Sequence, residues 1–211
     1  MRIFVALDLM SEIRQRLERF VEGVENFAPQ ARWVRPESLH VTLKFIGEKN
    51  GESVEGIKQA LASIRANPVV LNFRGYGFFP TPKAARVFWA GIETGPELAA
   101  LARQIDEATA TIGVVREDHT YSPHLTLARA GSGRTASRKS VRVAANSGAP
   151  HWQKSDGANQ RFARLQEKLD SLPTPEFGTM TARDFFLYES QLSRDGSRYT
   201  KIGQFALTPQ D

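Results

Sequence analysis

Two almost identical tetrapeptides constrain the fold of this chain more than any other feature. Residues 40–43 read His-Val-Thr-Leu, and residues 124–127 read His-Leu-Thr-Leu, 84 positions later. Side chains alternate between the two faces of a β-strand, so the His and Thr of each tetrapeptide project together and the aliphatic residues project the opposite way. The pattern therefore predicts two strands with apolar inner faces, each presenting one imidazole and one hydroxyl.

The segments that lead into the two tetrapeptides are also alike, because each contains a proline. Residues 35–39 read Arg-Pro-Glu-Ser-Leu, and residues 121–123 read Tyr-Ser-Pro. One His-x-Thr strand alone is weak evidence of function, because half-buried strands often carry Thr and sometimes His. The second copy, with its similar approach, indicates one structural unit used twice and favours a functional pair.

The residue types of the pair suit phosphate chemistry. An imidazole gives or takes a proton near neutral pH, and a hydroxyl donates a hydrogen bond to an anion. Two facing pairs would supply an acid, a base and two anchors for a phosphate. The chain has no cysteine, which excludes a thiolate nucleophile, and two histidines without acidic neighbours at the usual spacing make a poor metal site. We therefore expect no metal and no other cofactor.

Further stretches extend the pattern along most of the chain. The chain opens with residues 1–9 (MRIFVALDL), the first motif continues as Lys-Phe-Ile-Gly, the second continues as Ala-Arg, and residues 187–192 read LYESQL. With these stretches the sequence resembles the two-histidine (2H) phosphoesterases. Within that family it is most similar to the RNA 2′,3′-cyclic phosphodiesterases, historically called 2′-5′ RNA ligases.

The resemblance implies an activity and a role for each motif residue. The activity is hydrolysis of RNA 2′,3′-cyclic phosphate ends to 2′-phosphates, without a metal. His40 would be the proton donor, His124 the proton acceptor, and the hydroxyls of Thr42 and Thr126 would bind the non-bridging phosphate oxygens. The residues alone do not assign which histidine is the acid and which is the base.

Three further residues are candidates for substrate binding. Arg129 lies three positions after Thr126, so in a straight strand it faces away, and contact with a phosphate requires a bend or a long reach. Phe45 would contact substrate or pack in the core. Tyr121 would stack on a base or pack. His119 lies five positions before the second motif histidine, and we expect it to be structural or exposed.

The alternation of strand and helix patterns indicates an α+β protein. Strands are expected at 2–9, at 32–47 with a turn at 36–37, and at 69–79, 86–93, 178–190 and 199–207; helices are expected from Ser11 to Pro29, at 53–65, between Pro96 and Gly113, and at 160–172. The last two helices should turn Ile112 and Leu172 inward. The resemblance implies a single bilobal domain over 1–211, with two antiparallel sheets facing across a central cleft, helices outside and pseudo-two-fold symmetry.

Residues 131–159 break this pattern, because they are rich in Gly, Ser, Ala, Arg and Lys and lack a sustained period. We interpret them as a flexible insertion that acts as a solvated linker. The alternative is a basic lid over RNA. That lid would use the basic residues Arg134, Arg138, Lys139, Arg142 and Lys154, with Trp152 available to stack on a base.

The net charge of +5 favours a polyanionic partner such as RNA. The apolar run Ile3–Leu9 is too short to span a membrane, and no signal-peptide pattern accompanies it. We expect a cytoplasmic monomer with no obligate protein partner. Two alternatives remain open: a 2′-5′ RNA ligase that runs the reverse reaction on tRNA-like halves, and a non-catalytic RNA-binding module. The sequence has no G-x-x-x-x-G-K-[ST] motif that would indicate coupling to ATP.

Overall fold

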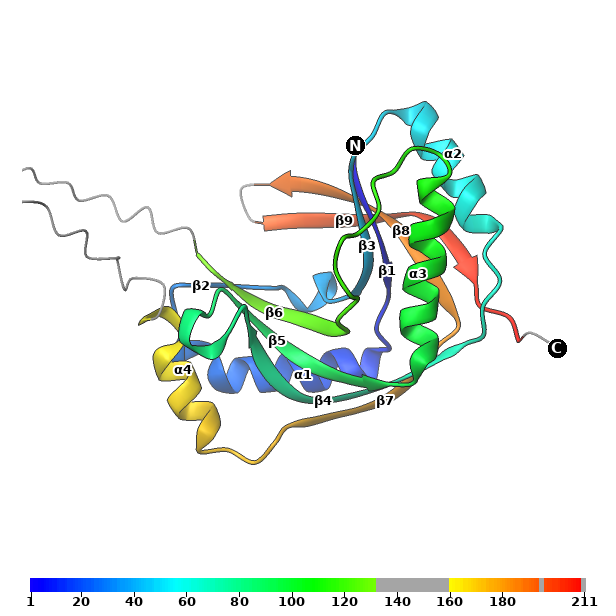
Figure 1. The fold of residues 1–211 in the computed structure, drawn as a ribbon. Coiled ribbons are helices and arrows are strands. Elements are labelled where there is room, and N and C mark those ends of the chain that lie inside the picture. The colour runs from blue at the N-terminus through cyan, green and yellow to red at the C-terminus, as the bar shows by residue number, and fades with distance from the viewer. Residues whose placement is uncertain (132–159, 194–195, 210–211) are drawn as a thin grey trace, which may run out of the picture.

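Two antiparallel sheets form the framework of the computed structural model, which describes residues 1–131, 160–193 and 196–209 (Figure 1). The four-stranded sheet has the order β3 (Val41–Glu48), β1 (Arg2–Leu7), β8 (Asp184–Ser193) and β9 (Gly196–Ala206). The five-stranded sheet has the order β2 (Ala31–Trp33), β6 (His124–Ala130), β5 (Val87–Thr94), β4 (Val69–Phe79) and β7 (Glu176–Ala182). The predicted α+β class with two antiparallel sheets is confirmed.

Within the described residues there are four α-helices, and their buried residues join the same hydrophobic core as the apolar faces of the strands. They are α1 (Ser11–Val24), α2 (Gly51–Ala62), α3 (Pro96–Ala110) and α4 (Gln160–Asp170), and the short 3₁₀ turns are η1 (Glu25–Phe27), η2 (Pro36–Ser38) and η3 (Pro82–Ala84). Helix α1 contacts β7 and α4, whereas α3 contacts β3 and α2 contacts β9. None of the helices within the described ranges is both long and apolar enough to cross a membrane.

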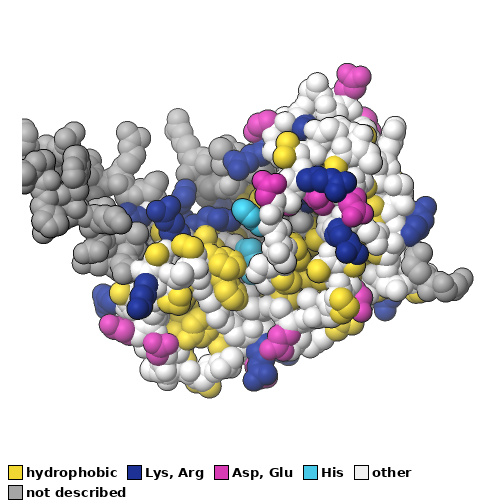
Figure 2. All heavy atoms as spheres, viewed as in Figure 1, with side chains coloured by type: hydrophobic (Ala, Val, Ile, Leu, Met, Phe, Trp, Pro, Cys, Tyr) yellow, Lys and Arg dark blue, Asp and Glu magenta, His cyan; other side chains and the backbone are white. Residues whose placement is uncertain are grey.

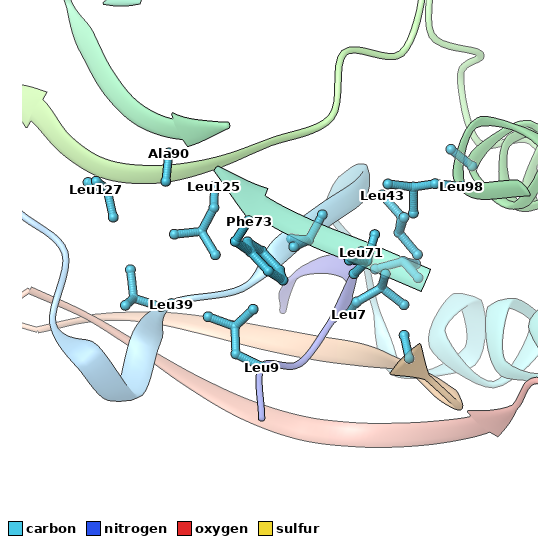
Figure 3. Close-up of a cluster of buried hydrophobic side chains, with 14 of the residues drawn as sticks. Leu7, Leu9, Leu39, Leu43, Leu71, Phe73, Ala90, Leu98, Leu125 and Leu127 are labelled. Carbon is cyan, nitrogen blue, oxygen red and sulfur yellow. The ribbon is translucent and has the colours of Figure 1, made fainter. Parts of the chain in front are cut away.

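One hydrophobic core joins the inner faces of both sheets. Three aliphatic residues of the two motifs, Leu43, Leu125 and Leu127, point into it and lie near Leu7 of β1 and Phe73 of β4 (Figure 3). All five are nearly or completely inaccessible to solvent. Burial of such side chains contributes roughly 1.5–3 kcal/mol each, so the motif strands are fixed in register by their apolar faces. The opposite faces are then free to carry chemistry.

One strand predicted from the sequence is wrong. Residues 178–190 were expected to form a single strand, but they belong to β7 and β8, which lie in different sheets. The chain changes sheet at Arg183, and β7 pairs with β4 while β8 pairs with β1. No Gly or Pro marks the change, and only Arg183 separates the end of β7 from the start of β8.

Two residues at helix ends were also misplaced. Ile112 and Leu172 were expected to face inward, but they are 45% and 37% exposed. Helix α3 ends at Ala110 and α4 ends at Asp170, so neither residue lies on a helical face. The final strand also begins earlier than expected, at Gly196. The predicted insertion at 131–159 falls, from residue 132 onward, outside the described residues.

Candidate active site

The two motif histidines are held by the same backbone device. His40 directly precedes β3, and His124 is the first residue of β6. The Nδ1 atom of His40 lies 2.7 Å from the carbonyl oxygen of Ser38, and Nδ1 of His124 lies 2.8 Å from that of Ser122. Because a carbonyl oxygen only accepts, each Nδ1 is the donor. The Nε2 atom of each ring is therefore left for proton transfer.

A β-bulge in β6 decides where Arg129 points. Opposite β5, Ala128 and Thr126 pair with consecutive residues, so Leu127 is the extra residue. Both Leu127 and Ala128 are buried, and the alternation of faces shifts by one position. Arg129 is consequently exposed on the side of Thr126. The strand thus has the bend that a phosphate contact by Arg129 requires.

The first motif strand contains the matching bulge. Opposite β1, Lys44 and Thr42 pair with consecutive residues, which makes Leu43 the extra residue. Leu43 and Lys44 are both buried, at 4% and 2% exposure, whereas Phe45 is 57% exposed. Phe45 therefore does not pack in the core, and it occupies the position in β3 that Arg129 occupies in β6.

Tyr121 joins the two motif segments. Strands β3 and β6 contact each other, and the Tyr121 hydroxyl donates a 3.0 Å hydrogen bond to the backbone oxygen of Thr42. Burial raises the pKa of Tyr121, so its hydroxyl keeps its proton at neutral pH. The side chain packs between the motifs, and its ring also lines the larger of two cavities at the site.

Each motif histidine lines a different cavity. A cavity of about 390 Å³ is lined by His40 together with Tyr188 and Tyr199, and one of about 720 Å³ is lined by Thr42 and His124. The larger cavity also has Phe45, Phe79, His119 and Tyr121 in its wall. His119 is exposed, as expected. Histidine side chains lie near the centre of the face in Figure 2, between a hydrophobic surface and Lys and Arg side chains.

Burial and positive charge lower the pKa of both histidines. Burial is the main cause for His40, with contributions from Arg129 and Arg14, and its pKa falls to about 4 although the Ser38 carbonyl opposes the change. Burial and the charge of Arg129 lower the pKa of His124, although the hydrogen bond to the Ser122 carbonyl raises it in part. Both rings are therefore neutral in the free protein at neutral pH. The shared influence of Arg129 also places its charge near both rings.

The sequence analysis did not identify the residues that support His40. Arg14 of α1 donates to Asp8 at 2.7 Å and also to the backbone oxygen of Pro36, in the turn that precedes the first motif. The rings of Phe4 and Tyr199 lie 4.7 and 5.1 Å from the imidazole of His40, measured between centroids. The signal in the sequence for this support is Asp8, a carboxylate within the apolar run Ile3–Leu9.

Trp89 plays the corresponding supporting role beside His124 and was also missed. Its ring lies 6.4 Å from that imidazole and rests on Gly77, where a Cβ atom would lie only 2.2 Å from the indole. Metal ligation has no candidate in residues 1–131, 160–193 and 196–209, where no three His, Cys, Asp or Glu side chains converge.

The fold and these paired imidazole and hydroxyl groups define a class, the α+β phosphoesterases that use two histidines. Residues 7–89 match the family model described as LigT like Phosphoesterase. An RNA 2′,3′-cyclic phosphodiesterase of Archaeoglobus fulgidus is 30% identical over 205 residues, which cover 97% of this chain and 99% of the relative. The chain belongs to this phosphoesterase family.

The relatives and the solved structures match this chain along nearly its whole length. An Escherichia coli protein, also named RNA 2′,3′-cyclic phosphodiesterase, is 26% identical over 210 residues. The match covers 98% of this chain and 97% of that relative. The crystal structure of Escherichia coli LigT complexed with 3′-AMP has a TM-score of 0.72 at 25% identity and covers 99% of this chain and 98% of its own.

Proposed function

We propose that the protein hydrolyses 2′,3′-cyclic phosphate ends of RNA to 2′-phosphates, without a metal. The observation that carries this proposal is the pair of equivalent Nδ1–carbonyl hydrogen bonds at His40 and His124, which leave two Nε2 atoms for acid and base work. The names of the relatives support the substrate class, since they describe phosphodiesterases acting on this RNA end.

In the proposed reaction, a water molecule attacks the phosphorus in line with the bond to the 3′-oxygen. His124 takes the proton from water through Nε2, the P–O3′ bond breaks, and His40 gives a proton to the departing 3′-oxygen. Each proton transfer is worth about 10²–10⁴-fold in rate. The order of donor and acceptor follows the family resemblance. After one turnover the two rings regain their starting protonation states through exchange with solvent.

The proposed donor acquires its proton when substrate binds. The pKa of His40 lies near 4 in the free protein, mainly because of burial. An anionic phosphate beside the ring favours the charged imidazolium and raises that pKa. The hydroxyls of Thr42 and Thr126 would donate to the non-bridging oxygens, where negative charge increases in the transition state. Arg129 would add a positive charge on the same face.

Phe45 and Tyr121 would complete the substrate contacts. The ring of Phe45 is 57% exposed, and it lies 6.1 Å from Phe4, so it offers a surface on which a base can stack. Tyr121 would contact the nucleoside through the part of its ring that lines the larger cavity, while its hydroxyl remains bound to the backbone of Thr42.

An oligonucleotide with a 2′,3′-cyclic phosphate end, incubated with the protein in EDTA, tests the proposal. We expect complete turnover to a 2′-phosphate, identified by comparison with 2′- and 3′-phosphate standards in chromatography. Activity that is lost in EDTA and restored by zinc or magnesium would contradict the metal-independent mechanism. A 3′-phosphate product would contradict the assignment of the broken bond.

A further inference from the structure

The larger cavity beside His124 has charged residues in its wall as well as aromatic ones. Besides the motif residues, its lining includes Lys44 of β3, Arg103 and Asp106 of α3, and Glu117. Helix α3 contacts β3, which brings these charged groups to the same cavity as the motif residues (Figure 1). A cavity of about 720 Å³ falls within the usual range for small-molecule sites, roughly 300–1,000 Å³.

Asp106 is fixed in this wall by two donors. The ammonium group of Lys44, whose side chain is completely buried, donates to Oδ1 of Asp106 and also to the backbone oxygen of Val115 at 2.9 Å. The backbone amide of Glu117 donates to the same Oδ1 at 3.0 Å. Both of these hydrogen bonds end on Oδ1, so the lone pairs of Oδ2 are left for a ligand.

The Asp106 carboxylate is ionised and accessible. Partial burial alone would raise the pKa of Asp106, but the hydrogen bonds from Lys44 and from the Glu117 amide lower it below its ordinary value. The side chain remains 18% exposed. An ionised carboxylate only accepts hydrogen bonds, so the group best suited to this part of the cavity is one that presents N–H donors.

The Lys44–Asp106 pair occurs on only one side of the pseudo-symmetric site. The bulge in β3 turns Lys44 inward, but the equivalent position in β6 is Ala128, which is also buried. A buried ion pair is often no more stabilising than apolar residues of similar volume. Stability alone therefore does not account for a lysine at position 44. A role in fixing the Asp106 carboxylate in the cavity wall does account for it.

We propose that this cavity binds the terminal base of the RNA and that Asp106 selects guanine by accepting its N1–H and N2–H groups. Among the four bases, guanine alone presents two adjacent N–H donors on its Watson–Crick edge, and uracil would direct carbonyl oxygens at the carboxylate. Phe45 and Phe79 provide apolar walls for stacking. Thr42 and His124 line the same cavity, so the attached phosphate remains between the motifs.

This inference rests on the proposed function, and a substrate series tests it. We would measure kcat/KM of the unaltered protein for guanosine, inosine and uridine 2′,3′-cyclic phosphates, since inosine lacks only the N2 amino group. We expect guanosine to exceed inosine by about tenfold, which is typical of one base-edge hydrogen bond pattern, and to exceed uridine by more. Equal values for the three substrates would overturn the base selection and leave the phosphodiesterase activity standing.

Product binding separates the two proposals. Calorimetry would give the Kd of guanosine, inosine and uridine 2′-monophosphates without any turnover. Tighter binding of the guanosine product by about tenfold supports the selection even if no cyclic substrate is hydrolysed, an outcome that would defeat only the proposed function. Equal Kd values would overturn the selection whatever the activity.

Two substitutions assign the selection to this cavity. Asp106→Asn should reduce the guanosine-to-inosine ratio from about ten to about one, and a ratio measured within one variant does not depend on its folded fraction. Ala99→Trp, on the exposed surface of α3 where it lines the cavity, should weaken binding of the guanosine product. Ala62→Trp on α2, which is exposed and not part of the lining, is the matched control. An unchanged ratio in Asp106→Asn, or equal effects of the two tryptophans, would overturn the proposal.

Discussion

The His40 and His124 halves of the site share a backbone and differ in their surroundings. Both rings donate from Nδ1 to the carbonyl two residues earlier, and each motif has a β-bulge at its last residue. Phe4 and Tyr199 surround the first imidazole, whereas the second has Phe79 at 4.9 Å. The two imidazoles are therefore held in place by the same backbone arrangement, and their different neighbouring side chains make them chemically unequal.

The residues after the two bulges extend this contrast. The same strand position carries an exposed aromatic ring in Phe45 and an exposed guanidinium in Arg129. One half can therefore offer a stacking surface while the other offers positive charge to a phosphate. A repeated backbone geometry thus becomes an asymmetric site through the different side chains around it, and the predictions below test whether the two halves are equivalent or distinct.

The largest expected effect is loss of either imidazole. His40→Ala and His124→Ala should each lower kcat by at least about 100-fold, since each removes one proton-transfer group. Steady-state kinetics on a cyclic-phosphate substrate measures this, and thermal melting checks the fold. His119→Ala is the control, because that exposed histidine lines the cavity without belonging to either motif. Damage from His119→Ala equal to that of a motif variant would show that the catalytic pair is wrongly assigned.

Loss of either motif threonine hydroxyl should have a smaller effect on activity than loss of either imidazole. Thr42→Ala and Thr126→Ala should each cost about 1–3 kcal/mol of transition-state stabilisation, the range for losing a hydrogen bond to a charged group. The measured quantity is kcat/KM, and Thr→Ser at each position should retain most of the activity because the hydroxyl remains. A large loss at one threonine and none at the other would show that only one half binds the phosphate oxygens.

The buried His40 predicts a pH dependence of stability. Its pKa is about 4 in the folded protein and 6.5 when solvated, so between these values the unfolded chain binds a proton that the native protein does not. The free energy of unfolding should therefore fall as the pH decreases from 6.5 to 4, by up to about 1.4 kcal/mol per pH unit. Urea denaturation at several pH values measures this slope.

The matched variants for this slope are His40→Gln and His119→Gln. His40→Gln removes the buried titrating group and should flatten the decrease between pH 6.5 and 4. His119→Gln changes an exposed histidine and should retain the slope of the unaltered protein. If the His40 variant kept the full slope, burial of this ring would not be the source of the acid sensitivity.

The motif strands and most helices were predictable because they depend on local periodicity. The His-x-Thr-Leu alternation gave both faces of β3 and β6, and the helix expected from Ser11 corresponds to α1. The bilobal arrangement came from the resemblance, since periodicity alone indicated only an α+β class. Local patterns thus accounted for most of the elements and placed the two motifs at strands.

The remaining features depend on pairing between distant strands, which a local pattern does not contain. Neither bulge has a sequence signal, because the extra residues Leu43 and Leu127 are ordinary strand residues. Without the bulges, Lys44 would be placed outside and Arg129 would face away from its motif. The change of sheet at Arg183 was missed for the same reason, since only one residue separates the two strands while their partners change.

The smallest expected effect concerns the hydroxyl that connects the halves. Tyr121→Phe removes the donor to the Thr42 backbone oxygen but keeps the ring in the cavity wall. We expect kcat to fall about fivefold, which corresponds to about 1 kcal/mol for one hydrogen bond, with KM nearly unchanged. Tyr76→Phe is the control, because it removes a hydroxyl that bonds Asp170 away from the site. Equal loss of kcat in both variants would attribute the effect to general stability, whereas a rise in KM for Tyr121→Phe would show that the hydroxyl contacts substrate rather than holding the two motifs together.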